Sequence, residues 1–162
     1  NPRIKLTKHV KNFIHRNPTF EPVVVDVYTA KVKLAGKPSW ADVTCNLRDD
    51  ASGSVTRLIG EQMQKQYDFM EQSSASSGID YKFTIRLEML DGGNGAHEPT
   101  VPETWEMYGC YLTGVNYGTV DYGSSEPVMI AMSISFDNAV QTALGSGIGT
   151  DVGRTLGDNV TG

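Results

Sequence analysis

Residues 81–90 read YKFTIRLEML, and apolar side chains alternate with polar ones from Tyr81 to Met89. Successive side chains of a β-strand point to opposite faces, so this period of two predicts a strand with one buried face and one solvent-facing face. The polar face carries Lys82, Thr84, Arg86 and Glu88. The stretch therefore favours a fold built on a half-buried β-sheet.

The same alternation recurs downstream of this stretch. Residues 128–136 read VMIAMSISF and predict a strand whose outward face is uncharged. That face consists of Met129, Ala131, Ser133 and Ser135. Residues 105–113 and 115–120 predict two more strands, with Gly114 and Gly118 as bends.

Alternation is also present upstream. Residues 23–34 change phase near Tyr28, which indicates a bulge or two short strands. Residues 40–47 alternate again after a turn signal, Gly36-Lys37-Pro38, so segments 23–34 and 40–47 are expected to form a hairpin. Residues 1–20 are weakly patterned, with a short helical turn expected around Val10, Phe13 and Ile14.

Only one long segment has helical spacing. Its apolar residues recur every three or four positions from Val55 to Met70, which predicts an amphipathic helix at about 54–72. Asp49 and Asp50 precede it and are expected to cap its first turn. The whole pattern predicts a mainly β protein, an antiparallel β-sandwich or open barrel with one amphipathic helix.

The charge is unevenly distributed along the 162 residues. Residues 1–37 carry a net charge of +6 and the remaining residues carry −11, which gives −5 in all. Three parts are therefore expected: a basic N-terminal arm at 1–20, a β domain at 21–140 and a Gly/Thr-rich C-terminal extension at 141–162. The basic arm fits contact with nucleic acid, with a membrane surface or with the acidic face of another copy, while a merely solvated basic end is equally compatible.

The sequence lacks the residue patterns of an enzyme or a metal site. His9 and His15 lie in the basic arm, and His97 lies in a Gly/Pro-rich loop, where a solvated surface side chain is the simplest interpretation. Cys45 and Cys110 stand alone inside apparent strands, which favours buried thiols over a disulfide framework. We therefore expect no enzyme activity, no cofactor and no metal, and the apolar runs are too short for a membrane helix.

The order of the elements resembles the tail tube proteins of contractile, T4-like bacteriophages. The resemblance covers roughly residues 22–140. It rests on the AKVKLAG hairpin strand at 30–36, the WADVTCNLRDD segment at 40–50, the following helix ending in YDFM at 67–70, and the YGCYLTGV strand at 108–115. The chain departs from that family at residues 1–20, which do not clearly supply its first strand. The Gly-rich end resembles the baseplate tube initiators of the same family.

This resemblance implies hexameric rings that stack into a hollow tube with a continuous inner β-barrel. It implies self-association, contact with tail sheath and baseplate proteins, and DNA that passes through the lumen without specific binding. The location implied is a virion tail assembled in the host cytoplasm, with no membrane. The expected lumen-facing residues are Lys82, Thr84, Arg86, Glu88, Ser133 and Ser135, and the expected inter-ring contacts are Lys5, Lys8, Lys11, Gly93, Asn94 and His97.

A second function class stays open at this point. Four tyrosines cluster near one end of the expected sheet, namely Tyr108, Tyr111, Tyr117 and Tyr122. Aromatic side chains on a β-sandwich can stack on a glycan or a peptide, so a non-catalytic binding module is the alternative to a tube subunit. The binding module predicts a well-behaved monomer, and the tube subunit predicts self-association.

Overall fold

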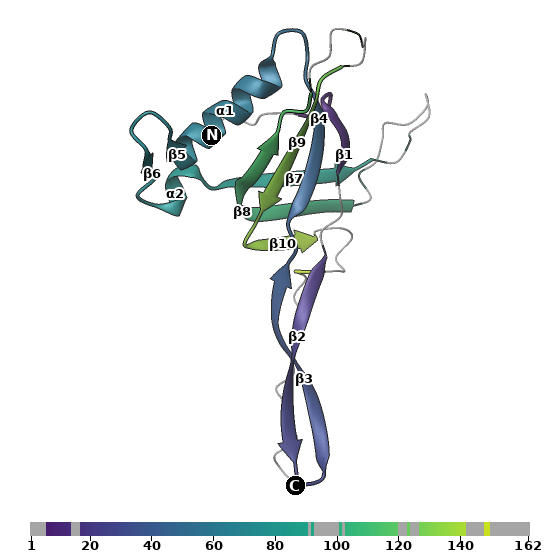
Figure 1. Ribbon diagram of the computed structural model, residues 1–162. Helices are drawn as coiled ribbons and strands as arrows, with labels where there is room; N and C mark the ends of the chain where they lie inside the picture. The colour runs from purple at the N-terminus through teal and green to yellow at the C-terminus, as the bar shows by residue number, and fades with distance from the viewer. Residues whose placement is uncertain are drawn as a thin grey trace. The chain divides into compact units, whose positions relative to one another are not determined.

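The computed structural model describes residues 6–13, 17–90, 92, 101, 103–119, 123, 127–141 and 148–149. The chain divides into two compact units, the first formed by residues 1–83 and 109–137 and the second by residues 84–108 and 138–162. The elements in chain order are β1 (Val10–Phe13), β2 (Pro18–Val27), β3 (Ala30–Trp40), β4 (Val43–Arg48), α1 (Ser54–Gln66), β5 (Tyr67–Asp68), β6 (Ser73–Ser74), α2 (Gly78–Tyr81), β7 (Phe83–Met89), β8 (Glu103–Asn116), β9 (Met129–Ser135) and β10 (Asn138–Gln141) (Figure 1). The predicted fold class, mainly β with antiparallel pairing and one longer amphipathic helix, is confirmed.

The first unit is built on an antiparallel sheet in the order β1-β4-β9-β8. The register places Leu47 of β4 opposite Ile130 of β9, and both side chains are fully buried. Val55 and Ile59 of α1 are buried as well. The alternation predicted for residues 128–136 therefore corresponds to β9, whose even-numbered residues lie in the core.

The expected helical turn at residues 10–14 is wrong, because residues 10–13 form strand β1. This strand pairs antiparallel with β4, and Val10 lies opposite Leu47. The Nδ2 of Asn46 also donates a 2.6 Å hydrogen bond to the Oδ1 of Asn12. The N-terminal region thus supplies a strand ahead of the hairpin, which the sequence pattern did not indicate.

The hairpin involves different strands from those expected. Tyr28 and Thr29 form the turn, and β2 pairs with β3 from Val27↔Ala30 to Pro18↔Trp40. Gly36-Lys37-Pro38 is therefore part of β3 and not a turn. A register shift between Phe20 and Pro22 accommodates this segment, because a bulge absorbs an unpaired residue. Segment 40–47 belongs mostly to β4, which pairs with β1 and β9 instead.

Helix α1 begins where the sequence predicts. The carboxylates of Asp50 and Asp49 accept hydrogen bonds from the backbone N–H groups of Ser54 (3.0 Å) and Val55 (3.2 Å). These are two of the donors that a helix N-terminus leaves without a partner. The helix ends at Gln66, earlier than the expected boundary near 72, because Tyr67 is extended and β5 pairs with β6.

The helix cap makes acid stability depend on Asp50. The hydrogen bond from the Ser54 N–H, together with that from the Ser52 hydroxyl, lowers the pKa of Asp50 from 3.8 to about 2. Because folding lowers the pKa of Asp50, its carboxylate stabilises the folded state at pH values above the unfolded-state pKa. This stabilisation is lost as the pH falls from about 4 to 2. We expect Asp50→Asn to be less stable than wild type at pH 7, and this difference to close near pH 2. Urea unfolding monitored by circular dichroism checks this, and a difference that does not change with pH would contradict it.

Strand β8 contributes to both units and is one continuous strand, whereas the sequence predicted two. Its register with β9 shifts between Leu112 and Gly114, so the expected bend at Gly114 is a bulge within the strand. Gly109 has a φ of 66°, and a Cβ there would overlap the carboxylate of Asp137, so the position requires glycine. Cys45 and Cys110 are buried thiols, as predicted, and burial raises the pKa of Cys45 to about 11.

The second unit joins most of β7, the first half of β8, and β10. Strand β10 pairs antiparallel with β8, from Asn138↔Tyr108 to Gln141↔Trp105. Among the described residues of this unit, the buried hydrophobic side chains are Trp105 and Met107 of β8 and Ala139 of β10. Within the ranges that the structure describes, no helix has the length and apolarity to cross a bilayer.

Candidate functional site

The β2–β3 hairpin has one face made entirely of apolar side chains. Its cross-strand pairs Val23↔Leu34, Val25↔Val32 and Val27↔Ala30 all lie on that face, because residues two apart in a strand share a face. The opposite face combines Val24 and Asp26 with Lys33 and Lys31. We call the first set the apolar hairpin face, consisting of Val23, Val25, Val27, Ala30, Val32 and Leu34.

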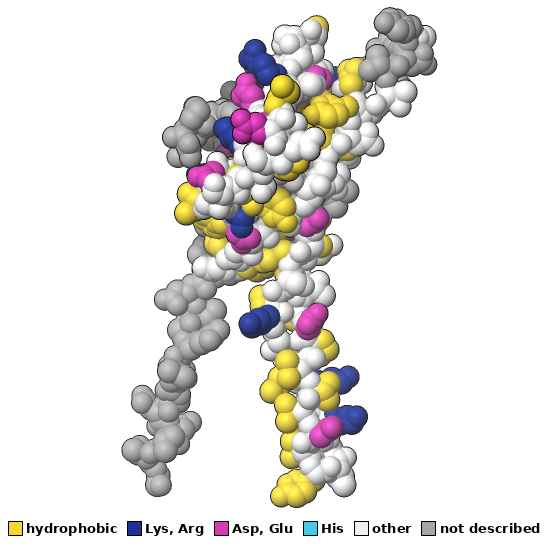
Figure 2. Space-filling model, turned by 60° about the vertical axis from the view of Figure 1, so that its left-hand side comes forward, with side chains coloured by type: hydrophobic (Ala, Val, Ile, Leu, Met, Phe, Trp, Pro, Cys, Tyr) yellow, Lys and Arg dark blue, Asp and Glu magenta, His cyan; other side chains and the backbone are white. Residues whose placement is uncertain are grey.

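The apolar hairpin face is open to solvent. Val25 is 42% exposed and Leu34 is 54% exposed, and every residue of β2 is classed as exposed. Figure 2 shows apolar side chains gathered along the hairpin, with charged side chains among them. A two-stranded hairpin is marginally stable by itself, and a contiguous apolar surface of this kind is typical of an interaction site.

The base of the hairpin is held to the sheet of the first unit, to which the hairpin belongs. The ring of Trp40 lies 5.5 Å from that of Phe136, measured between centroids. The N–H of Ala41 donates a 3.2 Å hydrogen bond to the carbonyl oxygen of Asn17, which brings the two ends of the hairpin together. The apolar hairpin face is therefore presented by a ribbon that is held at its base.

The tip of the hairpin is an aromatic residue in an uncommon backbone conformation. Tyr28 has a φ of 50°, and its side chain is completely exposed. Two-residue hairpin turns favour Gly, Asn or Asp at positive φ, since a larger side chain is strained there. A strained, exposed tyrosine is a common feature of binding surfaces and an unusual choice for a turn alone.

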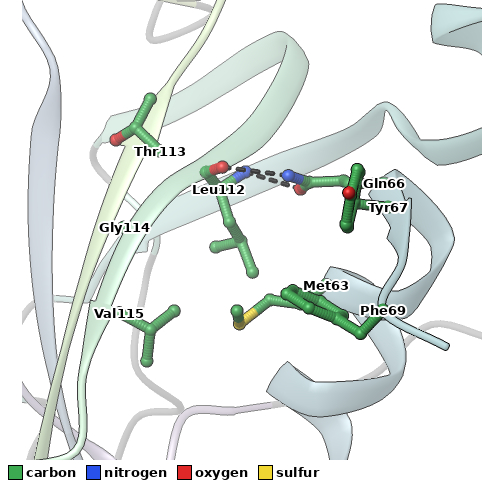
Figure 3. Close-up of a pocket in the computed structure, with 8 residues that line it drawn as sticks. All are labelled: Met63, Gln66, Tyr67, Phe69, Leu112, Thr113, Gly114 and Val115. Carbon is green, nitrogen blue, oxygen red and sulfur yellow. Dashed lines mark hydrogen bonds between the residues drawn. The ribbon is translucent and has the colours of Figure 1, made fainter. Parts of the chain in front are cut away.

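A small apolar groove lies between the end of α1, β5 and the bulged part of β8. We call it the α1–β8 groove, and its volume is about 100 Å³. Figure 3 shows the side chains of Met63, Phe69, Leu112 and Val115 around it. Gln66, Tyr67, Thr113 and Gly114 complete its lining. Phe69 is 57% exposed, so an aromatic ring of the wall remains accessible.

The side chain of Gln66 hydrogen-bonds the backbone of β8 at this groove. Its Nε2 donates to the carbonyl oxygen of Leu112 (2.9 Å), and its Oε1 accepts from the Leu112 N–H (2.8 Å), as the dashed lines in Figure 3 show. The two bonds imitate the pairing of a neighbouring strand. They protect an edge of β8 that would otherwise offer free backbone groups to another chain.

A basic pocket brings together two of the predicted inter-ring residues. Lys8 and Lys11 line a cavity of about 200 Å³ with His9 and Arg48, and the described residues that line it include no acidic side chain. The Nδ1 of His9 lies 3.2 Å from the Arg48 carbonyl oxygen, which ties the β1 region to β4. The other predicted inter-ring residues, Lys5, Gly93, Asn94 and His97, lie outside the described residues.

The predicted lumen residues of the first unit are Lys82, Ser133 and Ser135. Lys82 Nζ lies 2.7 Å from Asp137 Oδ2, and this hydrogen-bonded ion pair raises the pKa of Lys82. Ser133 and Ser135 are half-buried on β9 and alternate with the buried Met132 and Ile134. They therefore share the face of β9 that is turned away from the core.

The predicted lumen residues of the second unit are Thr84, Arg86 and Glu88. All three are exposed and share one face of β7, as the alternation predicts. Arg86 Nε lies 2.8 Å from Glu88, and Arg86 Nη1 lies 3.9 Å from Glu106. The ion pairs leave this face mixed in charge.

The tyrosines proposed for a glycan or peptide site have other partners. The ring of Tyr111 packs edge-on against Tyr81 at 6.4 Å, and the Tyr117 hydroxyl lies 3.8 Å from the Met63 sulfur. The Tyr108 hydroxyl donates to Glu106, which raises the pKa of Tyr108. Tyr122 lies outside the described residues. Across the described ranges, no three His, Cys, Asp or Glu side chains are grouped so that they could hold a metal ion.

Sequence reasoning missed both the apolar hairpin face and the α1–β8 groove. The alternation of residues 23–34 predicted strands with Val23, Val25 and Val27 on one face, but it did not indicate whether the same chain covers that face. The groove combines residues 63–69 with 112–115, whose proximity depends on the end of α1 and the bulge in β8. The groove has no local sequence signal, and the signal of the hairpin face does not reveal its exposure.

No family model and no curated protein matches this chain. Solved structures do match in fold. A chain in the cryo-EM structure of the anti-feeding prophage cap, the tube terminating cap, aligns with a TM-score of 0.59 at 11% identity, over 88% of this chain and 93% of that one.

Two further solved structures match over similar lengths. A chain in the anti-feeding prophage baseplate has a TM-score of 0.57 at 11% identity, over 83% of this chain and 80% of that one. A chain in the sheath–tube complex of the extracellular contractile injection system PVC has a TM-score of 0.58 at 11% identity, over 82% of both chains. At this identity the likeness establishes the fold, which this chain shares with chains of contractile injection systems.

Proposed function

We propose that this chain is a structural, non-enzymatic subunit of a contractile tail or a related injection machine. Copies associate into rings of six, and the rings stack into a hollow tube. The position in the machine is the tube itself, its baseplate initiator or its terminator. Fold alone does not determine function, so the proposal depends on surfaces that need a partner.

The observation that carries the proposal is the apolar hairpin face. A ribbon whose one face consists of six apolar residues gains free energy only when another surface covers that face. Closed, symmetric association of identical copies is the usual way to cover such surfaces and exposed strand edges. The fold shared with chains of tube, cap and baseplate structures supports the same assembly.

The proposed assembly has an inner surface that lines the channel and an outer surface that contacts other proteins. We propose that Lys82, Thr84, Arg86, Glu88, Ser133 and Ser135 face the channel, where ion pairs and small hydroxyls leave no net positive surface. Tight binding to the DNA backbone requires net positive charge, so DNA would pass such a wall without specific binding. Sheath and baseplate proteins contact the outside, and the assembly is located in a tail-like particle.

Basic and acidic surfaces would then meet between rings. The basic pocket contains Lys8, Lys11 and Arg48, while residues 38–162 carry a net charge of −11. We propose that the basic arm at 1–20, with Lys5, and the loop with Gly93, Asn94 and His97 contribute to this contact. The C-terminal extension at 141–162 is a further candidate for the same interface.

Electron microscopy with a light-scattering mass tests the proposal. We expect the concentrated chain to form six-fold rings or hollow rods, with masses that are multiples of six times 17.6 kDa. The matched control replaces residues 19–39 with a short Gly linker, which the Asn17–Ala41 hydrogen bond makes sterically feasible. This variant is expected to remain a folded monomer.

Two outcomes would count against the proposal. A wild-type chain that stays monomeric at all concentrations, even with tube or baseplate components added, would favour the binding-module alternative. A hairpin deletion that assembles as well as wild type would remove the observation on which the proposal rests.

A further inference from the structure

We propose that Tyr28, at the tip of the β2–β3 hairpin, inserts into the α1–β8 groove of a second copy of this chain. This pairing rests on the proposed self-assembly and specifies one of its contacts. It joins the most exposed aromatic side chain among the described residues to an apolar groove that its own chain leaves open.

The tip residue has the properties of an interface anchor. Tyr28 is completely exposed, and its φ of 50° is a conformation that glycine or asparagine would adopt with less strain. Turn geometry alone therefore does not account for a tyrosine at this position. Tyrosine is enriched among the residues that dominate binding free energy, since it combines a large apolar ring with a polar tip.

The groove has a size and chemistry that suit this side chain. Its walls are the side chains of Met63, Phe69, Leu112 and Val115, and Figure 3 shows them around a common space. The volume of about 100 Å³ compares with the roughly 150 Å³ that holds a benzene molecule in an engineered cavity. Because the groove is open on one side, a phenol ring can enter by its edge and keep its hydroxyl in water.

Phe69 and Met63 favour an aromatic guest. A ring that meets Phe69 edge-on gains aromatic pairing, and the Met63 sulfur makes favourable contacts with ring edges. The Tyr117 hydroxyl already lies 3.8 Å from the Met63 sulfur, which places a second phenol at this wall. An aliphatic guest would make neither of these contacts.

Charge complementarity supports a second copy as the occupant. The hairpin carries Lys31, Lys33 and Lys37 on β3 against Glu21 and Asp26 on β2, which leaves it with a net charge of +1. Residues 67–80, next to the groove, carry Asp68, Glu71 and Asp80 and no basic residue. Opposite charges on the two approaching surfaces raise the association rate and fix the orientation of docking.

Disulfide trapping between two variants tests the contact directly. One chain carries Tyr28→Cys and the other carries Phe69→Cys, so a cross-link between these two positions can form only between copies. Because each substitution removes a ring from the contact, the mixture is held at least about 30-fold above the wild-type assembly concentration. The native Cys45 and Cys110 are 5% and 0% exposed and are expected not to react. The matched control is Arg57→Cys, an exposed position near the far end of α1 and about 13 Å from the groove end of that helix.

We expect the Tyr28→Cys and Phe69→Cys mixture to give a cross-linked dimer on a non-reducing gel and the Arg57→Cys mixture to give little. Truncating an anchor residue typically weakens association about 30-fold, so Tyr28→Ala is expected to raise the concentration needed for assembly by roughly that factor. Tyr28→Phe, which keeps the ring, should assemble within about 3-fold of wild type.

The result that overturns the pairing differs from the one that overturns the proposed function. Normal tubes from Tyr28→Ala at wild-type concentration, or equal cross-linking by Arg57→Cys, would overturn the pairing and leave the tube proposal standing. A wild-type chain that never assembles would overturn both.

Discussion

Replacing Val25 with glutamate is expected to weaken self-assembly strongly without unfolding the chain. Val25 lies near the middle of the apolar hairpin face, opposite Val32, and is 42% exposed in the single chain. Covering this face in an assembly would bury the new carboxylate without a partner, at a cost of several kcal/mol. The concentration needed for assembly should therefore rise at least about 100-fold, as measured by sedimentation.

The neighbouring residue provides a matched control. Val24 is the same residue type and is 50% exposed, but it lies on the opposite face, across from Lys33. Val24→Glu puts the same charge in the same strand, next to a lysine, and should change the assembly concentration by less than about 3-fold. Equal effects of the two substitutions would mean that the hairpin does not bury one face, and the proposed interface would then be wrong.

The strands with the clearest alternation were predictable because tertiary structure reinforces the local pattern. In β7 and β9 every second side chain is turned inward, so the period of two is visible in the sequence. The start of α1 was equally predictable, since Asp49 and Asp50 cap it through local hydrogen bonds. In these elements the short-range signal and the final structure agree.

The elements that were missed depend on distant partners. Strand β1 is defined by its pairing with β4, more than thirty residues away, and its residues alone carry no strong pattern. The end of α1 is set by the β5–β6 pairing, although apolar residues continue at helical spacing to Met70. The hairpin turn at Tyr28 contains no glycine, whereas Gly36 and Pro38 gave a turn signal inside a strand.

The candidate site was predictable only in part, for the same reason. Lys8 and Lys11 were recognised from charge, but the cavity that they share with Arg48 requires the β1–β4 pairing. The α1–β8 groove and the role of Gln66 depend on the contact between the bulged part of β8 and the end of α1, which the bend expected at Gly114 did not by itself indicate. A surface that depends on which residues pair across neighbouring strands can be recognised only once that pairing is known.

Gln66→Ala is expected to destabilise the chain more than any other surface substitution on α1. Its side chain makes two part-buried hydrogen bonds to the backbone of Leu112. Losing them leaves one N–H and one carbonyl without a protein partner, at about 1–3 kcal/mol each when buried. Because water can reach the open groove, we expect about 2–3 kcal/mol in total, seen as a fall in the thermal midpoint of roughly 4–12 °C.

Two further variants isolate the hydrogen bonds as the cause. Gln64→Ala removes an exposed side chain from the same turn, which accepts a long 3.5 Å hydrogen bond from the Phe69 N–H and also hydrogen-bonds the exposed carboxylate of Asp68. This variant should cost less than about 0.5 kcal/mol. Gln66→Glu keeps the volume and the acceptor but loses the donor at neutral pH, so it should also be less stable than wild type. If Gln66→Glu were as stable as wild type, the pairing of Gln66 with Leu112 would not be what holds this edge of β8.

An exposed β8 edge should also make Gln66→Ala prone to disordered aggregation, which electron microscopy distinguishes from ordered rods.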